Sequence, residues 1–218
     1  MGQNSFGGTA PGPDPRPPAT TPKQPAPGSI APGPTPGGGI DPELARMEAI
    51  ERQDMGVAPP AQLHTGAMHG PTPTSLPGGR LVTTREIYEL VRRTQGDRAT
   101  APRVFDILGG QERLPGALLA LPAAQPGSFD DATQREFGNF LQGVVQGRRD
   151  LPMIFYCAST QCWLSYNAAL RAVRLGYTNV LWYRGGLEAW KRAGLPLQKA
   201  DGGPGGAGPQ GGAPGPAR

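Results

Sequence analysis

Between residues 81 and 197 the pattern of apolar and polar positions switches repeatedly between two periods. Short, nearly continuous apolar runs are typical of buried strands, and apolar residues three and four positions apart are typical of helices. Strands are expected at the start of "LVTTREIYELVRR", in "RVFDIL", after the turn of "LPGALLALP", in "LPMIFY" and in "NVLWY". Strands that alternate with helices predict an α/β fold, with a mostly parallel central sheet flanked by helices.

The expected helices lie between these strands and show recognisable ends. Thr83 or Thr84 is expected to cap the first of them, and Asp130 is expected to cap "DATQREFGNFLQGVVQG". A third helix is expected from Trp163 to a stop at Gly176, and "GGLEAWKRAG" predicts a short last helix. The apolar faces of the first two helices are expected to carry Ile87, Leu90, Val91, Phe137, Phe140, Leu141 and Val144.

Composition divides the chain into five segments. The chain of 218 residues contains 34 Gly and 27 Pro, which are concentrated at its two ends. Such ends bury too little apolar surface to offset their chain entropy, so we expect them to be disordered. The expected division is a Pro/Gly-rich arm (1–40), a short amphipathic helix (41–54), a linker loop (55–79), one domain (80–198) and a Gly/Pro-rich tail (199–218).

The short helix follows the sequence "DPELARMEAIERQ". Asp41 suits the N-cap and Pro42 suits the first helical position. Leu44, Met47 and Ile50 are spaced to share one side, and a helix of about three turns is marginal on its own. We expect it to dock on the domain or, together with the Pro-rich arm, on a protein partner.

The charge and the remaining composition exclude several classes of function. The formal net charge is +4, without a dense basic stripe and with few aromatic residues, so a nucleic-acid partner is not expected. No apolar run is long enough to span a membrane, and no signal peptide is visible. A mildly basic domain favours a small anionic ligand. The compartment is left open between the cytoplasm and, after removal of a signal peptide, the periplasm.

Two histidines, His64 and His69, lie in the linker with Met68 between them. They could form a metal pair, but no carboxylate or Cys is close in sequence. We therefore favour two exposed loop histidines and expect neither a metal nor a cofactor.

The two cysteines, Cys157 and Cys162, lie in "IFYCASTQCWLSYNAALRA". Cys157 directly follows an expected strand, and Cys162 directly precedes an expected helix. The loop between them therefore lies at the carboxyl edge of a parallel sheet, where ligands bind in such folds. The following helix N-terminus shifts a thiol toward the thiolate and attracts anions. Two thiols without further ligands make a zinc site improbable.

Four blocks of the chain together resemble the rhodanese-like domain family over about residues 81–197. They are "RVFDIL", "LPGALLALP", "IFYC" and "LGYTNVLWYRGGLEAW". The cysteine block, with "CW" and "SYNAA", is similar to a bacterial subgroup that carries a CxxCW signature and is linked to PQQ-dependent alcohol catabolism. Here the spacing is C-x4-C-W, so the match to that subgroup is partial.

The resemblance implies a sulfurtransferase that carries sulfane sulfur as a persulfide on Cys157, with a small sulfur-containing anion or a thiol as substrate. Backbone N–H groups of the loop are then expected to cradle the sulfur. The family usually has an Arg where this chain has Cys162, which makes plain thiosulfate a weaker donor. A phosphatase loop of the Cys-x5-Arg type is not expected, because the sixth position after Cys157 is Trp163. The expected substrate-binding residues are Ala158, Ser159, Thr160, Gln161, Trp163 and Arg184.

Alternative roles stay open for several of these residues. Cys162 could resolve a persulfide as a second thiol, form a standing disulfide, or cap the helix, and we favour the redox-active pair. Asp106 is expected to hold a neighbouring loop, and Gly185 and Gly186 to form a tight turn near the site. Arg184 could replace the missing loop cation or be a surface residue.

The three tryptophans, Trp163, Trp182 and Trp190, are interpreted mainly as packing residues. The alternative to an enzyme is a non-catalytic rhodanese-like binding module or a thiol–disulfide accessory protein of a PQQ-dependent pathway.

Overall fold

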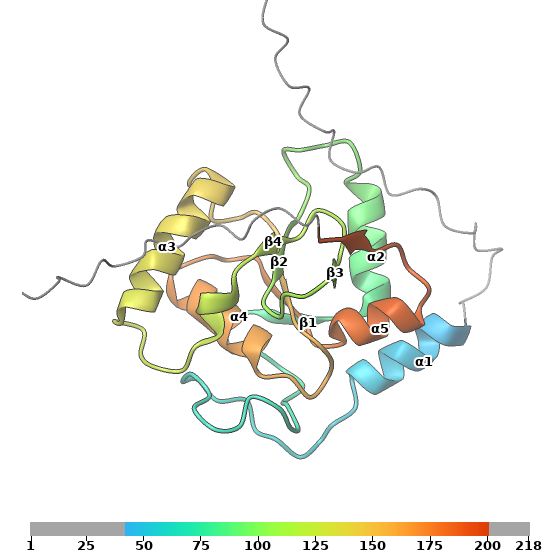
Figure 1. Cartoon of the computed structure of the whole chain (residues 1–218), viewed down its shortest axis with the longest axis horizontal. Helices are drawn as coiled ribbons and strands as arrows, with labels where there is room; N and C mark the ends of the chain where they lie inside the picture. Colours follow the sequence, from blue (N-terminus) through green and yellow to red (C-terminus); the bar gives the residue numbers. More distant parts are fainter. Residues whose placement is uncertain (1–41, 201–218) are drawn as a thin grey trace, which may run out of the picture.

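The computed structural model describes residues 42–200, which fold as an α/β structure (Figure 1). The expected arm and most of the expected tail, as well as Asp41, lie outside the described residues. In chain order the elements are α1 (Pro42–Glu51), β1 (Arg80–Val82), α2 (Thr84–Arg93), β2 (Arg103–Asp106), β3 (Glu112–Arg113), β4 (Leu118–Leu119), the 3-10 helix η1 (Leu121–Ala124), α3 (Ala132–Val145), β5 (Met153–Tyr156), α4 (Leu164–Arg174), β6 (Val180–Tyr183), α5 (Gly186–Arg192) and β7 (Gln198–Lys199).

The central sheet has five strands in the order β1-β6-β5-β2-β4, and all its pairings are parallel. Asp106 is in register with Tyr156, and Tyr156 is in register with Tyr183. The last residues of β2, β5 and β6 therefore lie side by side, so the loops that follow these strands leave from one edge.

Helices cover both faces of the sheet, as the sequence predicts. Phe105, Phe155 and Trp182 face α3, α4 and η1, and they share one apolar cluster with these elements. Ile154 and Leu181, next along the strands, face α2 and α5 in a second cluster. In Figure 1, α3 and α4 lie on the opposite side of the strands from α2 and α5. Neighbouring strand residues point to opposite faces, so apolar runs without alternation are what a sheet buried on both sides requires.

The capping residues of the two predicted helices are Thr83 and Asp131. The Thr83 side chain accepts a hydrogen bond from Glu86 N, and the Glu86 side chain accepts one from Thr83 N. The Asp131 carboxylate accepts from Gln134 N at 2.7 Å, so the cap of α3 is Asp131 rather than the expected Asp130. Both aspartates suit this role chemically, and the register of the helix decides between them.

Helix α1 packs on the domain, beside α5 and α2 (Figure 1). Its docked face differs from the expected apolar stripe. Met47 and Glu51 are buried, whereas Ile50 is 39% exposed. A small antiparallel sheet of β3 and β7 was not expected, because strands of two residues show no periodicity. No helix in residues 42–200 is long and apolar enough to cross a membrane.

Candidate functional site

The two cysteines form a disulfide at the carboxyl edge of the sheet. β5 ends at Tyr156, Cys157 is the next residue, and α4 begins two residues after Cys162. Their Cα atoms are 6.4 Å apart, and Cys157 and Cys162 are only 1% and 5% exposed. The predicted strand–loop–helix arrangement is thus observed, with α4 beginning at Leu164, one residue after the expected Trp163.

The sulfur of Cys157 lies against Ser165, in the first turn of α4. Ser165 Oγ is 3.2 Å from Cys157 Sγ, and the indole of Trp182 donates to Ser165 Oγ at 3.1 Å. The carbonyl oxygen of Cys162 is 3.4 Å from Cys157 Sγ. Sequence reasoning missed Ser165, although "SYNAA" was part of the cysteine block that is similar to the CxxCW subgroup. Its first residue is the one that α4 turns toward the loop.

Some backbone N–H groups of the loop form hydrogen bonds within the loop itself. Gln161 N donates to the Ser159 hydroxyl at 3.3 Å, and Cys162 N donates to Ser159 O at 3.2 Å. Two of the N–H groups that were expected to cradle an anion are therefore engaged within the loop. Among the described residues, the N–H groups of Ala158, Ser159 and Thr160 have no protein acceptor, so the expected cradle narrows to these three.

A segment from the predicted linker, residues 63–72, lies against this loop and is called the strap here. Trp163 N donates to Met68 O at 3.0 Å, and Gly70 N donates to Gln161 O at 2.8 Å. Thr72 Oγ1 donates to Thr160 O at 2.5 Å. The strap thus holds the outer side of the loop through two backbone hydrogen bonds and the Thr72 hydroxyl, a role that the irregular sequence of the strap does not reveal.

His64 and His69 differ in the structure, contrary to the expectation of two exposed histidines. His69 is exposed, but the ring of His64 is half-buried and stacks on Trp163, with ring centroids 3.9 Å apart. Asn167 binds the backbone of His64, accepting from its N–H at 2.8 Å and donating to its carbonyl at 2.9 Å. Trp163 is 5% exposed, which favours packing over contact with a substrate. Within residues 42–200 no cluster of His, Cys, Asp and Glu could hold a metal ion.

Asp106 and the Gly185–Gly186 turn lie at the same edge of the sheet as the two cysteines. Asp106 is buried, and its carboxylate accepts from Leu108 N and Gly109 N, both at 2.9 Å, which holds the loop after β2. Gly186 has φ +64°, and a Cβ there would collide with the backbone of Cys157 and Ala158. The turn therefore lies directly on the Cys157–Cys162 loop, called the thiol loop here. Leu187 N donates to Cys157 O at 2.9 Å.

Arg184 does not replace the missing loop cation, which corrects one of the two expectations for it. The side chain is 1% exposed. Its guanidinium donates to Thr72 Oγ1 at 2.9 Å, Thr72 O at 2.8 Å, Glu51 O at 2.8 Å and Gln53 O at 2.7 Å. It is not a surface residue either. Arg184 joins β6 to the end of α1 and to the strap, and burial lowers its pKa.

Glu51, at the end of α1, is a buried carboxyl beside this arginine. It accepts hydrogen bonds from Thr84 N at 3.0 and 3.1 Å and from Thr84 Oγ1 at 2.5 Å. The Thr84 hydroxyl is also 2.7 Å from Tyr183 Oη. Burial raises the pKa of Glu51 to about 7, and the hydrogen bonds from Thr84 oppose this rise.

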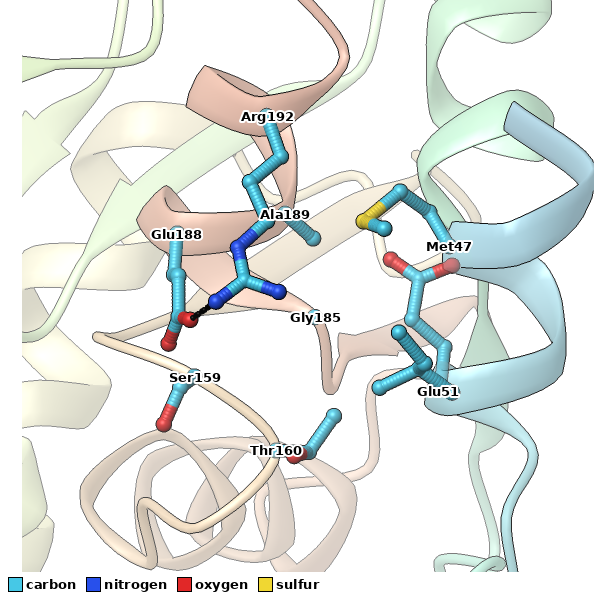
Figure 2. Close-up of a pocket in the computed structure, with 9 residues that line it drawn as sticks. Met47, Glu51, Ser159, Thr160, Gly185, Glu188, Ala189 and Arg192 are labelled. Carbon is cyan, nitrogen blue, oxygen red and sulfur yellow. Dashed lines mark ion pairs between the residues drawn. The ribbon is translucent and has the colours of Figure 1, made fainter. Parts of the chain in front are cut away.

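A small pocket of about 40 Å³ lies between α1, α5 and the thiol loop (Figure 2). Ser159 and Thr160 line it from the loop, and the Glu188–Arg192 ion pair lines it from α5. A second, more open and largely apolar hollow is lined by Met68 and Leu164, among others. Neither Cys157 nor Cys162 lines either pocket, so the sulfur atoms are enclosed in this disulfide form. Of the other expected substrate-binding residues, Ala158 is half-buried and Gln161 is exposed.

Residues 89–193 match the model of the rhodanese-like domain family. Among solved structures, the chain is similar to the rhodanese-like domain of an Anabaena sp. protein determined by NMR in solution. That similarity has 17% identity and a TM-score of 0.37, and it covers 58% of this chain and 86% of the other. No curated protein matches the chain.

Proposed function

Because the chain carries a rhodanese-like domain, we propose that it is a sulfurtransferase that carries sulfane sulfur as a persulfide on Cys157. The observation that carries this proposal is the place of Cys157. It directly follows β5, in a six-residue loop that ends at Cys162 beside the N-terminus of α4. The N-terminal end of a helix favours the thiolate, which is the nucleophilic form of a cysteine.

In the first half of the proposed cycle, the reduced enzyme takes up sulfur. The Cys157 thiolate attacks the outer sulfur of a donor such as thiosulfate, the S–S bond of the donor breaks, and sulfite leaves with the electron pair. The persulfide on Cys157 is then held by the N–H groups of Ala158, Ser159 and Thr160. Preorganised donors of this kind stabilise an anion without reorganising at the moment of reaction.

In the second half, the sulfur leaves by one of two routes. An acceptor thiolate attacks the outer sulfur and releases the Cys157 thiolate. Alternatively, the Cys162 thiolate attacks Cys157 Sγ of the protonated persulfide, the S–S bond of the persulfide breaks, hydrosulfide leaves with its proton and the electron pair, and the Cys157–Cys162 disulfide forms. This second route makes Cys162 the resolving thiol, and an external thiol must reduce the disulfide before the next round.

The observed disulfide also favours a second candidate, a thiol–disulfide accessory protein. In that role the pair exchanges electrons with a partner and carries no sulfur. The link of this candidate to a PQQ-dependent pathway rests on the partial CxxCW match of the sequence. The non-catalytic binding module makes no use of a reactive thiol pair, so the disulfide does not favour it.

Intact mass spectrometry separates the two candidates. Reduced wild type, Cys157→Ser and Cys162→Ser are incubated with thiosulfate or with a low-molecular-weight persulfide, and each is weighed. The sulfurtransferase gains about 32 Da, one sulfur atom, in Cys162→Ser but not in Cys157→Ser, because loading follows the thiolate. Wild type shows the same gain or, once Cys162 has resolved the persulfide, the disulfide. If no donor loads Cys157 and wild type only loses about 2 Da to its disulfide, the sulfurtransferase proposal is wrong and the accessory role stands.

A further inference from the structure

The Ser165 hydroxyl lies between a buried indole and the sulfur of Cys157. Trp182 donates its indole N–H to Ser165 Oγ at 3.1 Å, and Ser165 Oγ is 3.2 Å from Cys157 Sγ. Ser165 and Trp182 are 1% and 0% exposed, so this contact is shielded from bulk water. The two residues come from different elements, α4 and β6, which fix the hydroxyl from two sides.

The direction of the Ser165 proton follows from the chemistry of the two neighbours. An indole N–H can only donate, so Trp182 occupies a lone pair of Ser165 Oγ and cannot accept the proton. The sulfur of Cys157 is the other polar atom within hydrogen-bond distance. Ser165 therefore donates toward Cys157 Sγ, and Trp182 holds it in that orientation.

We propose that Ser165 is a catalytic residue of the thiol site, which stabilises the Cys157 thiolate by donating a hydrogen bond to its sulfur. Trp182 is the positioning residue that acts through Ser165. The inference rests on the proposed role of Cys157 as sulfur carrier and deepens it. A hydrogen bond to an ionised acceptor is stronger than one between neutral groups, and it is worth more in a water-free site.

The effect of this hydrogen bond falls on the steps in which Cys157 leaves. When an acceptor thiolate attacks the outer sulfur of the Cys157 persulfide, the S–S bond breaks and its electron pair stays on Cys157 Sγ. When an external thiolate attacks Cys162 Sγ of the disulfide, the same atom receives the electron pair and a mixed disulfide forms on Cys162. A thiol with a lower pKa leaves faster, so Ser165 assists both steps.

The two sulfur atoms of the disulfide are unequal in this respect. Within residues 42–200, Cys157 Sγ has the Ser165 hydroxyl as a hydrogen-bond partner, whereas Cys162 Sγ makes no side-chain hydrogen bond. Cys162 is also the more exposed of the pair, at 5% against 1%. This asymmetry makes Cys157 the better leaving group and Cys162 the point of attack when the disulfide opens.

The test uses the fact that the chain has only two cysteines. In the full-length Cys162→Ser protein Cys157 is the single thiol, and its pKa is read from the pH dependence of its alkylation by iodoacetamide. Adding Ser165→Ala is expected to raise that pKa by about one unit, so that alkylation is roughly tenfold slower at a pH below both pKa values. Ser165→Thr retains a hydroxyl and is expected to restore most of the rate. Trp182→Phe is expected to shift the pKa in the same direction by less.

A purely structural role for Ser165 predicts a different result. It lowers the urea midpoint of Ser165→Ala and leaves the alkylation profile of the folded protein unchanged, and that outcome overturns the proposal. If Ser165→Ala does not fold, the folded fraction of Trp182→Phe carries the test, because this variant keeps the Ser165 hydroxyl and removes the indole N–H together with part of the buried ring system. An unchanged profile in that variant also overturns it. Iodoacetamide requires no sulfur donor, so this result is independent of whether Cys157 loads sulfur.

Discussion

The loops after β5 and β6 leave adjacent strands at the same edge of the sheet, yet their polar residues are held in opposite ways. Cys157, after β5, has one covalent partner that a thiol can displace, and one hydroxyl beside its sulfur. Arg184, after β6, donates four hydrogen bonds to carbonyl and hydroxyl oxygens of the protein. Four of the five N–H donors of the guanidinium are thus used by the fold, and the side chain is 1% exposed, so Arg184 is not placed to bind a ligand. At this edge of the sheet the cysteine is therefore the residue available for reaction, and the arginine holds α1 and the strap in place.

The two regions are connected through Thr72 of the strap. Its hydroxyl accepts from Arg184 Nε at 2.9 Å and donates to Thr160 O in the thiol loop. The hydrogen bonds by which Arg184 holds α1 and the strap thus continue through Thr72 to the loop that contains the disulfide. Substitutions at Arg184, at Glu51 and at Thr72 therefore test the difference between the two regions.

Arg184→Lys and Arg184→Met should give the largest loss of stability. Lysine has three donors in a different geometry and methionine has none, so the buried carbonyls of Glu51 and Thr72 and the partly buried carbonyl of Gln53 lose their partners. We expect the free energy of unfolding to fall by about 4 kcal/mol in both variants, by urea titration. Sulfur loading per folded molecule should stay at the wild-type level in both. Loading that survives in the lysine variant and is lost in the methionine variant would show that Arg184 binds the donor as a cation.

Glu51→Gln should change how stability depends on pH. The pKa of Glu51 is raised to about 7 in the folded protein, from an ordinary value of 4.5. The folded state therefore holds this proton more tightly than the unfolded state, and the stability this provides is complete below pH 4.5 and lost as the pH rises through 7. Between these limits the difference in unfolding free energy should move by about 3 kcal/mol in favour of the glutamine variant. Parallel stability curves for the two proteins would contradict the burial of an ionisable Glu51.

Thr72→Val should have a smaller effect, because it removes only the hydrogen bonds of the Thr72 hydroxyl, which connect Arg184 to the thiol loop. Valine has nearly the same shape, but Thr160 O loses its donor and Arg184 Nε loses its acceptor. We expect a loss of about 2 kcal/mol and a faster reduction of the Cys157–Cys162 disulfide by dithiothreitol. Thr178→Val is a matched control, since the Thr178 hydroxyl donates to Arg149 O at an exposed position. Equal reduction rates in the two variants would mean that the strap does not restrain the loop.

Much of this arrangement could be predicted from the sequence. Apolar runs and caps gave the parallel sheet, the flanking helices and the place of the thiol loop after β5, because strand and helix periods are local properties. The burial of Arg184 could not be predicted, since its partners at Glu51, Gln53 and Thr72 are more than a hundred positions away. Ser165 was missed because it lies on helix α4 while its orienting donor, Trp182, lies on strand β6, so no local pattern shows that the two meet.

In the proposed cycle Cys157 carries the sulfur, and Cys162 carries none but forms the disulfide with Cys157. Trypsin should release residues 150–171 as one peptide that contains both cysteines, so fragmentation of this peptide can assign an added sulfur to one of them. Reduced wild type is loaded with a persulfide donor, alkylated at once and digested. The account predicts an additional mass of about 32 Da, one sulfur atom, on Cys157, the more thiolate-like residue. The added sulfur on Cys162 would contradict it, as would the absence of added sulfur in both wild type and Cys162→Ser.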